Sequence, residues 1–247
     1  MYLPDSLKKN PQFRKASTVL RNQLELGQLS LRLPLLSGYS IEKVDPDHSI
    51  KKVYEEYTTS VSTPIATISL ELACVIWFLL NKLRPRLIVD LGSGFSSYLF
   101  RLYQDTRKGS DDACQVFSCD DSSFWLELTR RFLKSKSLSV EGLCLWDEFV
   151  NEYQGRRPDL VLHDLGNPQL RVMNMSRVFD LCTPETTLIL DDIQKPRIKQ
   201  AALNTLAQRG GRGHDLARLT YDKFGRYAWM IDKVANASRN PSPGRAN

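Results

Sequence analysis

The sequence predicts an α/β fold: a mostly parallel seven-stranded sheet with an antiparallel last strand, helices on both faces and a helical cap at the N-terminus. Five short apolar runs, each followed by charged or turn-forming residues, are typical of strands buried on both faces. Stretches with helical periodicity separate them. Strand followed by helix, repeated, indicates a parallel sheet with right-handed crossovers.

The predicted elements follow in chain order. The five apolar runs are residues 87–91, 116–119, 143–146, 160–162 and 188–190. The periodic stretches that predict helices are residues 96–106, 122–136, 169–181 and 197–208. Two more strand-like stretches, 215–220 and 226–234, flank a turn at 221–225. They break the strand–helix rhythm and predict a terminal antiparallel hairpin.

A long helix is expected before the first strand. Pro64 marks its predicted start, and the apolar residues up to Leu83 should pack on the sheet, with Arg84 and Pro85 ending the helix. Its most apolar part, 72–80, spans nine residues, whereas roughly 20 are needed to cross a bilayer. The sequence therefore predicts a buried helix and no membrane span.

Three regions are expected along the chain. Residues 1–60 form a more polar cap segment, residues 61–234 the ligand-binding α/β domain, and residues 235–247 a tail without apolar content that should be disordered. We expect the cap either to select the substrate or to form an oligomer interface, as in a homodimer.

Composition narrows the class of protein further. Five widely spaced cysteines, an odd number that lies mostly within apolar runs, predict free thiols in a reducing cytoplasm. The start MYLPDSLKKN has no secretion signal, so we expect no secretion. The formal net charge of +6 lies partly in expected tails and loops, which favours a solvated surface over nucleic-acid binding.

A ligand site is expected where the first strand ends. The strand runs straight into Gly92, Ser93 and Gly94 and then into a helix. Glycine lets the backbone turn tightly and approach a ligand, and the helix N-terminus presents free N–H groups that suit a carboxylate or phosphate. A purely structural turn is the alternative interpretation.

Two neighbouring strand ends add candidates for a nucleoside. The second strand ends in Asp120 and Asp121, and a carboxylate there can accept both hydroxyl protons of a ribose. Asp120 is the candidate for that role. Its alternative is the N-cap of the next helix, for which Asp121 is better placed. At the end of the third strand, the indole of Trp146 can cover the face of an adenine and the carboxylate of Asp147 can accept its amino group. The alternative is that these residues belong to the core or cap a helix.

Four segments carry a resemblance to a known family. RPRLIVDLGSGFSS, VFSCDDSSFW, PDLVLHDLGN and TTLILDDI resemble the successive motifs of class I S-adenosylmethionine (SAM) dependent methyltransferases, which have a Rossmann-like sheet. The similarity is greatest to the small-molecule O-methyltransferase branch with catechol O-methyltransferase-like and cephalosporin hydroxylase-like proteins. It implies SAM as cofactor, a small-molecule hydroxyl as acceptor, Asp90 near the amino group of the methionine moiety, that moiety at Gly92 to Gly94, and weaker contacts from Ser62 and Thr63.

The ends of the fourth and fifth strands are expected to hold the chemistry. They place His163, Asp164, Asp191 and Asp192 at one edge, where carboxylates repel one another unless a cation or proton intervenes. An ion such as Mg²⁺ would relieve that repulsion and lower the pKa of a bound hydroxyl. The alternatives are capping for Asp191 and Asp192, and contact with a covering helix for His163.

The resemblance makes Asp164, Asp191 and Asp192 the candidate metal ligands, because metal-dependent relatives bind an ion with acidic residues at these strand ends. Catechol-type relatives carry a lysine base three residues after the first ligand, where this chain has Asn167. His163 or Asp164 is therefore the expected general base.

Arg171 and Lys195, in loops near this edge, are interpreted as solvated surface charges, with contact to an anionic substrate as the alternative.

Other functions stay open at this point. NAD binding is disfavoured because its fingerprint needs glycine at Ser97 and a shorter gap to Asp120, usually roughly 20 residues. Methylation of nucleic acid or protein is a second alternative, although Asn167 and Pro168 are not followed by the proline and aromatic residue typical of amino-methylating nucleic-acid enzymes. A SAM-binding module without catalysis is a third.

Overall fold

The computed structural model describes residues 34–109, 113–153 and 155–234. The chain divides into two compact units, residues 1–40 and 41–247. The described part of the first unit holds one 3₁₀ turn, η1 (Pro34–Leu36). Most of the predicted cap and the whole of the predicted tail lie outside the described residues.

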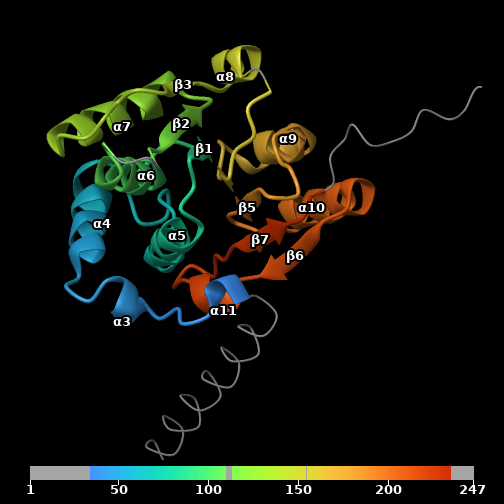
Figure 1. The fold of residues 1–247 in the computed structure, drawn as a ribbon, viewed down its shortest axis with the longest axis horizontal. Coiled ribbons are helices and arrows are strands. Elements are labelled where there is room, and N and C mark those ends of the chain that lie inside the picture. The colour runs from blue at the N-terminus through green and yellow to red at the C-terminus, as the bar shows by residue number, and fades with distance from the viewer. Residues whose placement is uncertain (1–33, 110–112, 154, 235–247) are drawn as a thin grey trace, which may run out of the picture. The chain divides into compact units, whose positions relative to one another are not determined.

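A seven-stranded sheet forms the second unit, with strand order β3-β2-β1-β4-β5-β7-β6 (Figure 1). The strands are β1 (Leu87–Leu91), β2 (Gln115–Asp120), β3 (Leu143–Leu145), β4 (Leu160–His163), β5 (Thr187–Leu190), β6 (Arg212–Asp215) and β7 (Trp229–Asp232). The first five are parallel, and β7 is antiparallel to both β5 and β6. The predicted sheet, mostly parallel with an antiparallel last strand, is confirmed.

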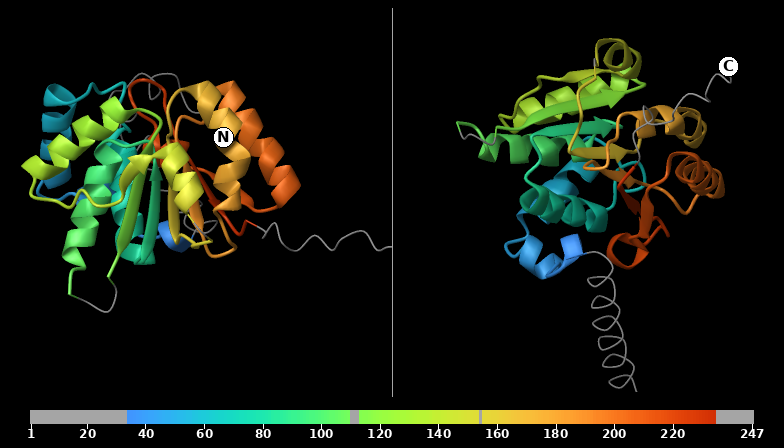
Figure 2. Two further views of the ribbon diagram at one scale, coloured as in Figure 1. Left: turned by 90° about the horizontal axis from the view of Figure 1, so that it is seen from above. Right: turned by 45° about the vertical axis from the view of Figure 1, so that its right-hand side comes forward.

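Helices cover both faces of this sheet, as Figure 2 shows in its left view. One layer consists of α4 (Ser49–Ser60), α5 (Leu70–Leu83), α6 (Phe95–Thr106) and α7 (Ser123–Ser135). The other consists of α8 (Trp146–Glu152), α9 (Pro168–Asp180) and α10 (Pro196–Arg209). The short helices α3 (Ile41–Val44) and α11 (Ala217–Thr220) both contact α5.

Burial on both faces explains the apolar strands. Each residue of β4 and β5 is buried, because helices cover both sides of these central strands. Local start signals then set the helices. Ser122 caps α7 by accepting a hydrogen bond from the Trp125 N–H (3.4 Å), and Asn167 caps α9, which begins with Pro168.

Two predicted elements are wrong in their bounds. Residues 215–220 do not form a strand: β6 ends at Asp215, whose carboxylate accepts the Ala217 N–H (2.7 Å) and turns the chain into α11. The helix predicted to start at Pro64 starts at Leu70 instead. There Ser69 Oγ accepts the Leu72 N–H (3.0 Å) as N-cap, which leaves residues 62–69 irregular.

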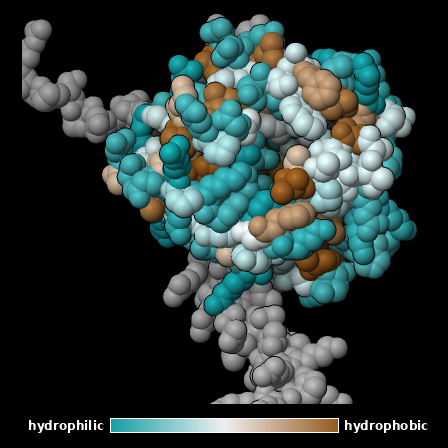
Figure 3. Space-filling model, turned by 180° about the vertical axis from the view of Figure 1, so that it is seen from behind, coloured by the Kyte–Doolittle hydropathy of each residue, from teal (hydrophilic) through white to brown (hydrophobic). Residues whose placement is uncertain are grey.

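Smaller expectations have clear outcomes. The helix before β1 ends at Leu83 as predicted, whereas Trp146 opens α8 and does not end β3. All five cysteines are free, as predicted. In the described ranges, no helix has both the length and the apolar character that crossing a bilayer requires. Apolar side chains on the face in Figure 3 form small groups on a mostly polar surface.

Candidate functional site

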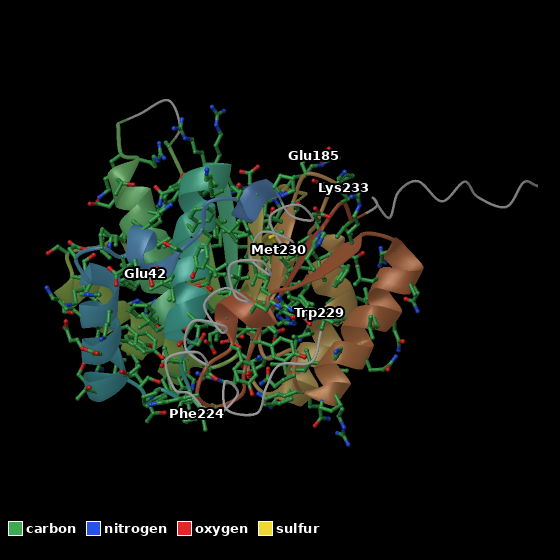
Figure 4. All side chains as sticks on the ribbon, turned by 90° about the horizontal axis from the view of Figure 1, so that it is seen from below. Glu42, Glu185, Phe224, Trp229, Met230 and Lys233 are labelled. Atoms are coloured by element: carbon green, nitrogen blue, oxygen red, sulfur yellow. The ribbon has the colours of Figure 1, made fainter. Side chains whose placement is uncertain are left out.

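The candidate site is a cavity of about 430 Å³ at the carboxyl ends of the parallel strands. Small-molecule sites typically measure about 300 to 1,000 Å³. The turns that follow β1, β2, β4 and β5 line the cavity, together with part of the irregular segment 62–69 and Arg226. Figure 4 shows Phe224, from the same loop as Arg226, at the opposite end of the sheet from Glu185 and Lys233.

The glycine turn and Asp120 meet at this cavity. The backbone N–H and the hydroxyl of Ser93 both donate to Asp120 Oδ2 (2.8 Å each), and the Ser122 N–H donates to Oδ1 (3.0 Å). Ser93, Asp120 and Asp121 line the cavity. Burial raises the pKa of Asp120 to about 6, although these donors lower it. Two candidates from different strands are thus in direct contact.

Glycine is required at position 92 by the protein's own packing. Gly92 has φ +109°, and a Cβ there would lie 2.5 Å from the backbone oxygen of Asp164. Its N–H also donates to the carbonyl of Cys119 (2.8 Å). No other residue type accommodates both the positive φ and the close approach. The turn after β1 therefore packs directly on the turn after β4.

Asp90 is connected by hydrogen bonds to the turn after β1. It is fully buried and does not line the cavity. Its Oδ2 accepts the Ser97 hydroxyl (2.6 Å), and Ser97 Oγ accepts the Gly94 N–H (3.2 Å). Burial raises the pKa of Asp90 to about 6, with hydrogen bonds from serines acting against it. The serine that departs from the NAD fingerprint thus links Asp90 to the turn.

The remaining nucleoside candidates divide into two groups. Asp121 lines the cavity, and Ser122, not Asp121, caps α7. Trp146 is buried in the core, where its Nε1 donates to Asn174 Oδ1 (3.2 Å), and Asp147 is exposed in the first turn of α8. The structure places Trp146 and Asp147 outside the cavity lining.

Ser62 and Thr63 also lie outside the cavity lining. The residues of the same segment that do line it are Ile65, Ala66 and Thr67.

Arg171 lies between the acidic residues of the fourth and fifth strand ends. Its guanidinium forms ion pairs with Asp164 and, at 3.1 Å, with Asp192 Oδ2, and its Nε donates to the Gly166 carbonyl (3.3 Å). Only 8% of the side chain is exposed. The interpretation of Arg171 as a solvated surface charge is therefore wrong.

Lys195 and Asp191 complete this cluster. Lys195 pairs with Asp192, and although burial raises the pKa of Asp192, Lys195 and Arg171 lower it overall. Burial, and then the charges of Asp164 and Asp192, raise the pKa of Asp191 to about 8. Asp191 Oδ1 accepts the Asp192 N–H (2.7 Å). Asp164, Asp191 and Asp192 all line the cavity.

His163 faces a covering helix. The ring is buried, its Nε2 lies 3.3 Å from the Arg171 carbonyl on α9, and it does not line the cavity. Burial, with the charge of Arg171, lowers its pKa to about 4. Of the two predicted bases, only Asp164 reaches the cavity.

The acidic cluster does not fit the predicted Mg²⁺ site. A divalent ion needs several oxygen ligands that face one point. Here the guanidinium of Arg171 lies between Asp164 and Asp192, and a second cation, Lys195, binds Asp192. Within residues 34–109, 113–153 and 155–234, no three or more His, Cys, Asp or Glu side chains are arranged to hold a metal ion.

Arg226 is a site residue that the sequence analysis assigned to a strand. Its side chain donates to the carbonyls of Pro64 (2.9 Å), Ile65 (2.9 Å) and Thr67 (2.8 Å), and pairs with Asp222 (2.7 Å). It thereby fastens the segment before α5 to the loop before β7. The spacing of Asp222 and Arg226 across a turn could have predicted their ion pair. The carbonyls that accept from Arg226 could not be predicted, because they lie about 160 residues away in the chain.

Comparison with known proteins supports the fold. No model of a known protein family matches the chain, and no curated protein matches it. Among solved structures, an O-methyltransferase from Bacillus cereus in complex with S-adenosylhomocysteine (SAH) has a TM-score of 0.55 at 13% identity, covering 76% of this chain and 91% of its own.

Two other solved structures agree. An SAH-bound methyltransferase from Podospora anserina has a TM-score of 0.53 at 13% identity and covers 74% of this chain and 87% of its own. A methyltransferase from Geobacter sulfurreducens has a TM-score of 0.53 at 15% identity and covers 83% of this chain and 96% of its own. With the strand order described above, these likenesses show that the chain has a Rossmann-like α/β fold shared with these methyltransferases.

Proposed function

We propose that the protein is a SAM-dependent methyltransferase that transfers a methyl group to a hydroxyl of a small molecule. One observation carries the proposal: Ser93 of the glycine turn donates two hydrogen bonds to Asp120, and both residues line the cavity. An amino-acid moiety and a ribose would then lie side by side. The fold and the SAH-bound structures that resemble it support this assignment.

Asp120 has the capacity to bind a ribose. Each carboxylate oxygen can accept about two hydrogen bonds. Ser122 donates one to Oδ1, which leaves room there for a ribose hydroxyl, whereas Ser93 donates two to Oδ2, so a second ribose hydroxyl would take the place of the Ser93 hydroxyl. The methionine moiety would lie over the turn at 92–94, where α6 begins and its N-terminus favours a carboxylate. Asp121 and Trp125 also line the cavity, close to Asp120 in the chain, and we assign them to contact with the nucleoside.

The acceptor would lie near Asp164. Its hydroxyl oxygen attacks the methyl carbon, the bond between that carbon and the sulfonium breaks, and SAH leaves as a neutral thioether. Asp164 is the proposed acceptor of the hydroxyl proton, because it is the predicted base that lines the cavity. Alignment of the two reactants supplies most of the acceleration in such a displacement.

Replacing Asp120 with alanine tests the proposal. Calorimetric titration of the wild type with SAM or SAH should show binding, and Asp120→Ala should weaken it by about 1.5 to 3 kcal/mol, the usual contribution of hydrogen bonds to a charged group. The matched control is Asp105→Ala, whose exposed carboxylate on α6 pairs with Lys108. It should leave the affinity unchanged. Absence of SAM and SAH binding to the wild type would refute the proposal.

A further inference from the structure

We propose that Arg171 is a built-in cation that takes the place of a divalent ion at the end of β4 and β5, so that methyl transfer proceeds without a metal. The inference rests on the proposed function. It concerns a positioning residue: Arg171 acts through Asp164, and Asp164 meets the acceptor. This explains why the acidic cluster does not fit the Mg²⁺ ion that the resemblance to metal-dependent methyltransferases implies.

The geometry fixes the guanidinium in three directions. One terminal nitrogen pairs with Asp164, the other lies 3.1 Å from Asp192 Oδ2, and Nε donates to the Gly166 carbonyl at 3.3 Å. Arg171 itself lies in α9, close to its start at Pro168. A planar guanidinium with five N–H donors bridges two carboxylates in this way and stays charged in proteins. Its charge is therefore permanent at this position.

Charge balance opposes an additional divalent ion. Asp164 and Asp192, two of the three predicted ligands, are already paired with the cations of Arg171 and Lys195. An ion bound to Asp164 and Asp192 would have to displace the guanidinium. That would leave a buried positive charge without its partners beside a new double charge, which is unfavourable.

The arrangement also suits proton transfer. When the acceptor oxygen forms its bond to the methyl carbon, the hydroxyl proton passes to Asp164, and the positive charge of the sulfonium is lost as SAH forms. Arg171 keeps its ion pair with Asp192 while Asp164 is neutral, so the guanidinium is not left without a carboxylate. Asp164 then releases the proton to water.

Metal binding provides a test that does not depend on activity. Mn²⁺ is titrated into EDTA-treated wild type, Arg171→Gln and the control Arg209→Gln, and the bound ion is followed by electron paramagnetic resonance. Arg209, at the end of α10, pairs with Asp180 at the end of α9. Wild type and control should bind no Mn²⁺ at this site up to millimolar concentration. Arg171→Gln should bind Mn²⁺ with an affinity at least about tenfold above that millimolar limit, and Asp164→Asn in that background should abolish the binding.

Three outcomes would overturn the proposal. These are a wild-type Mn²⁺ signal that Asp164→Asn removes, a folded Arg171→Gln protein that gains no Mn²⁺ binding, or SAM binding to the wild type that requires added metal. If Arg171→Gln does not fold, the wild-type titration and its Asp164→Asn partner still decide the question. SAM titration runs in parallel: its failure would refute the proposed function, whereas the Mn²⁺ result bears on Arg171 alone.

Discussion

Replacing Arg226 with alanine is expected to lower the free energy of unfolding by about 3 to 5 kcal/mol, because removing one member of a buried ion pair leaves the other charge uncompensated. The side chains of Arg226 and Asp222 are only 11% and 5% exposed. The variant would also leave the carbonyls of Pro64, Ile65 and Thr67 without their donor. The segment before α5 should then detach from the loop before β7.

Urea unfolding measures the first effect, and limited proteolysis within residues 62–69 measures the second. Arg131→Ala is the matched control, since that arginine is 73% exposed and pairs with Glu127 along one helix. Exposed pairs of this kind contribute at most about 1 kcal/mol. Equal urea midpoints for Arg226→Ala and wild type, with unchanged proteolysis, would show that Arg226 does not fasten the two segments.

Asp90→Asn is expected to stabilise the protein at pH 8. Burial raises the pKa of Asp90 from 3.8 to about 6, so the folded state holds the proton more tightly than the unfolded chain does. The stabilisation from that proton is complete below the unfolded pKa and is lost as the pH rises through about 6. Asparagine, which never ionises, avoids that loss and can still accept the Ser97 hydroxyl.

The expected gain is about 3 kcal/mol at most, since each pKa unit corresponds to about 1.4 kcal/mol. Urea unfolding at about pH 8 and about pH 3 checks it: the gain should be present at the higher pH and absent at the lower, which lies below the unfolded pKa. Asp105→Asn, at an exposed position, should give no such gain at either pH. A pH-independent difference between Asp90→Asn and wild type would contradict the assigned role of burial.

Patterns that act over short distances predicted most of the fold. Each strand and helix could be predicted from its own residues, because apolar runs indicate strands buried on both faces and periodic stretches indicate helices. Their alternation along the chain then predicted the parallel order. Parallel strands then bring their carboxyl ends to one edge, which is why Ser93, Asp120, Asp164 and Asp191 could be expected together.

Partners distant in sequence explain what was missed. Arg171 resembles any exposed charge on a helix until the topology brings Asp192 beside it. Pro64 was predicted to start a helix because its local sequence allows one. In the structure the carbonyls of Pro64 and Ile65 accept hydrogen bonds from Arg226, about 160 residues later in the chain. Contact with a covering helix was the alternative expected for His163, and the structure identifies that helix as α9.

The contact between Gly92 and Asp164 has a mechanical consequence. Because the backbones touch there, and the Asp164 N–H donates to the carbonyl of Leu91 (2.6 Å), the two loops cannot move separately. A ligand that displaces the loop after β1 is therefore expected to displace the loop that carries Asp164, the proposed base. Occupancy of the cavity beside Gly92 is thereby coupled to the position of Asp164 through main-chain atoms.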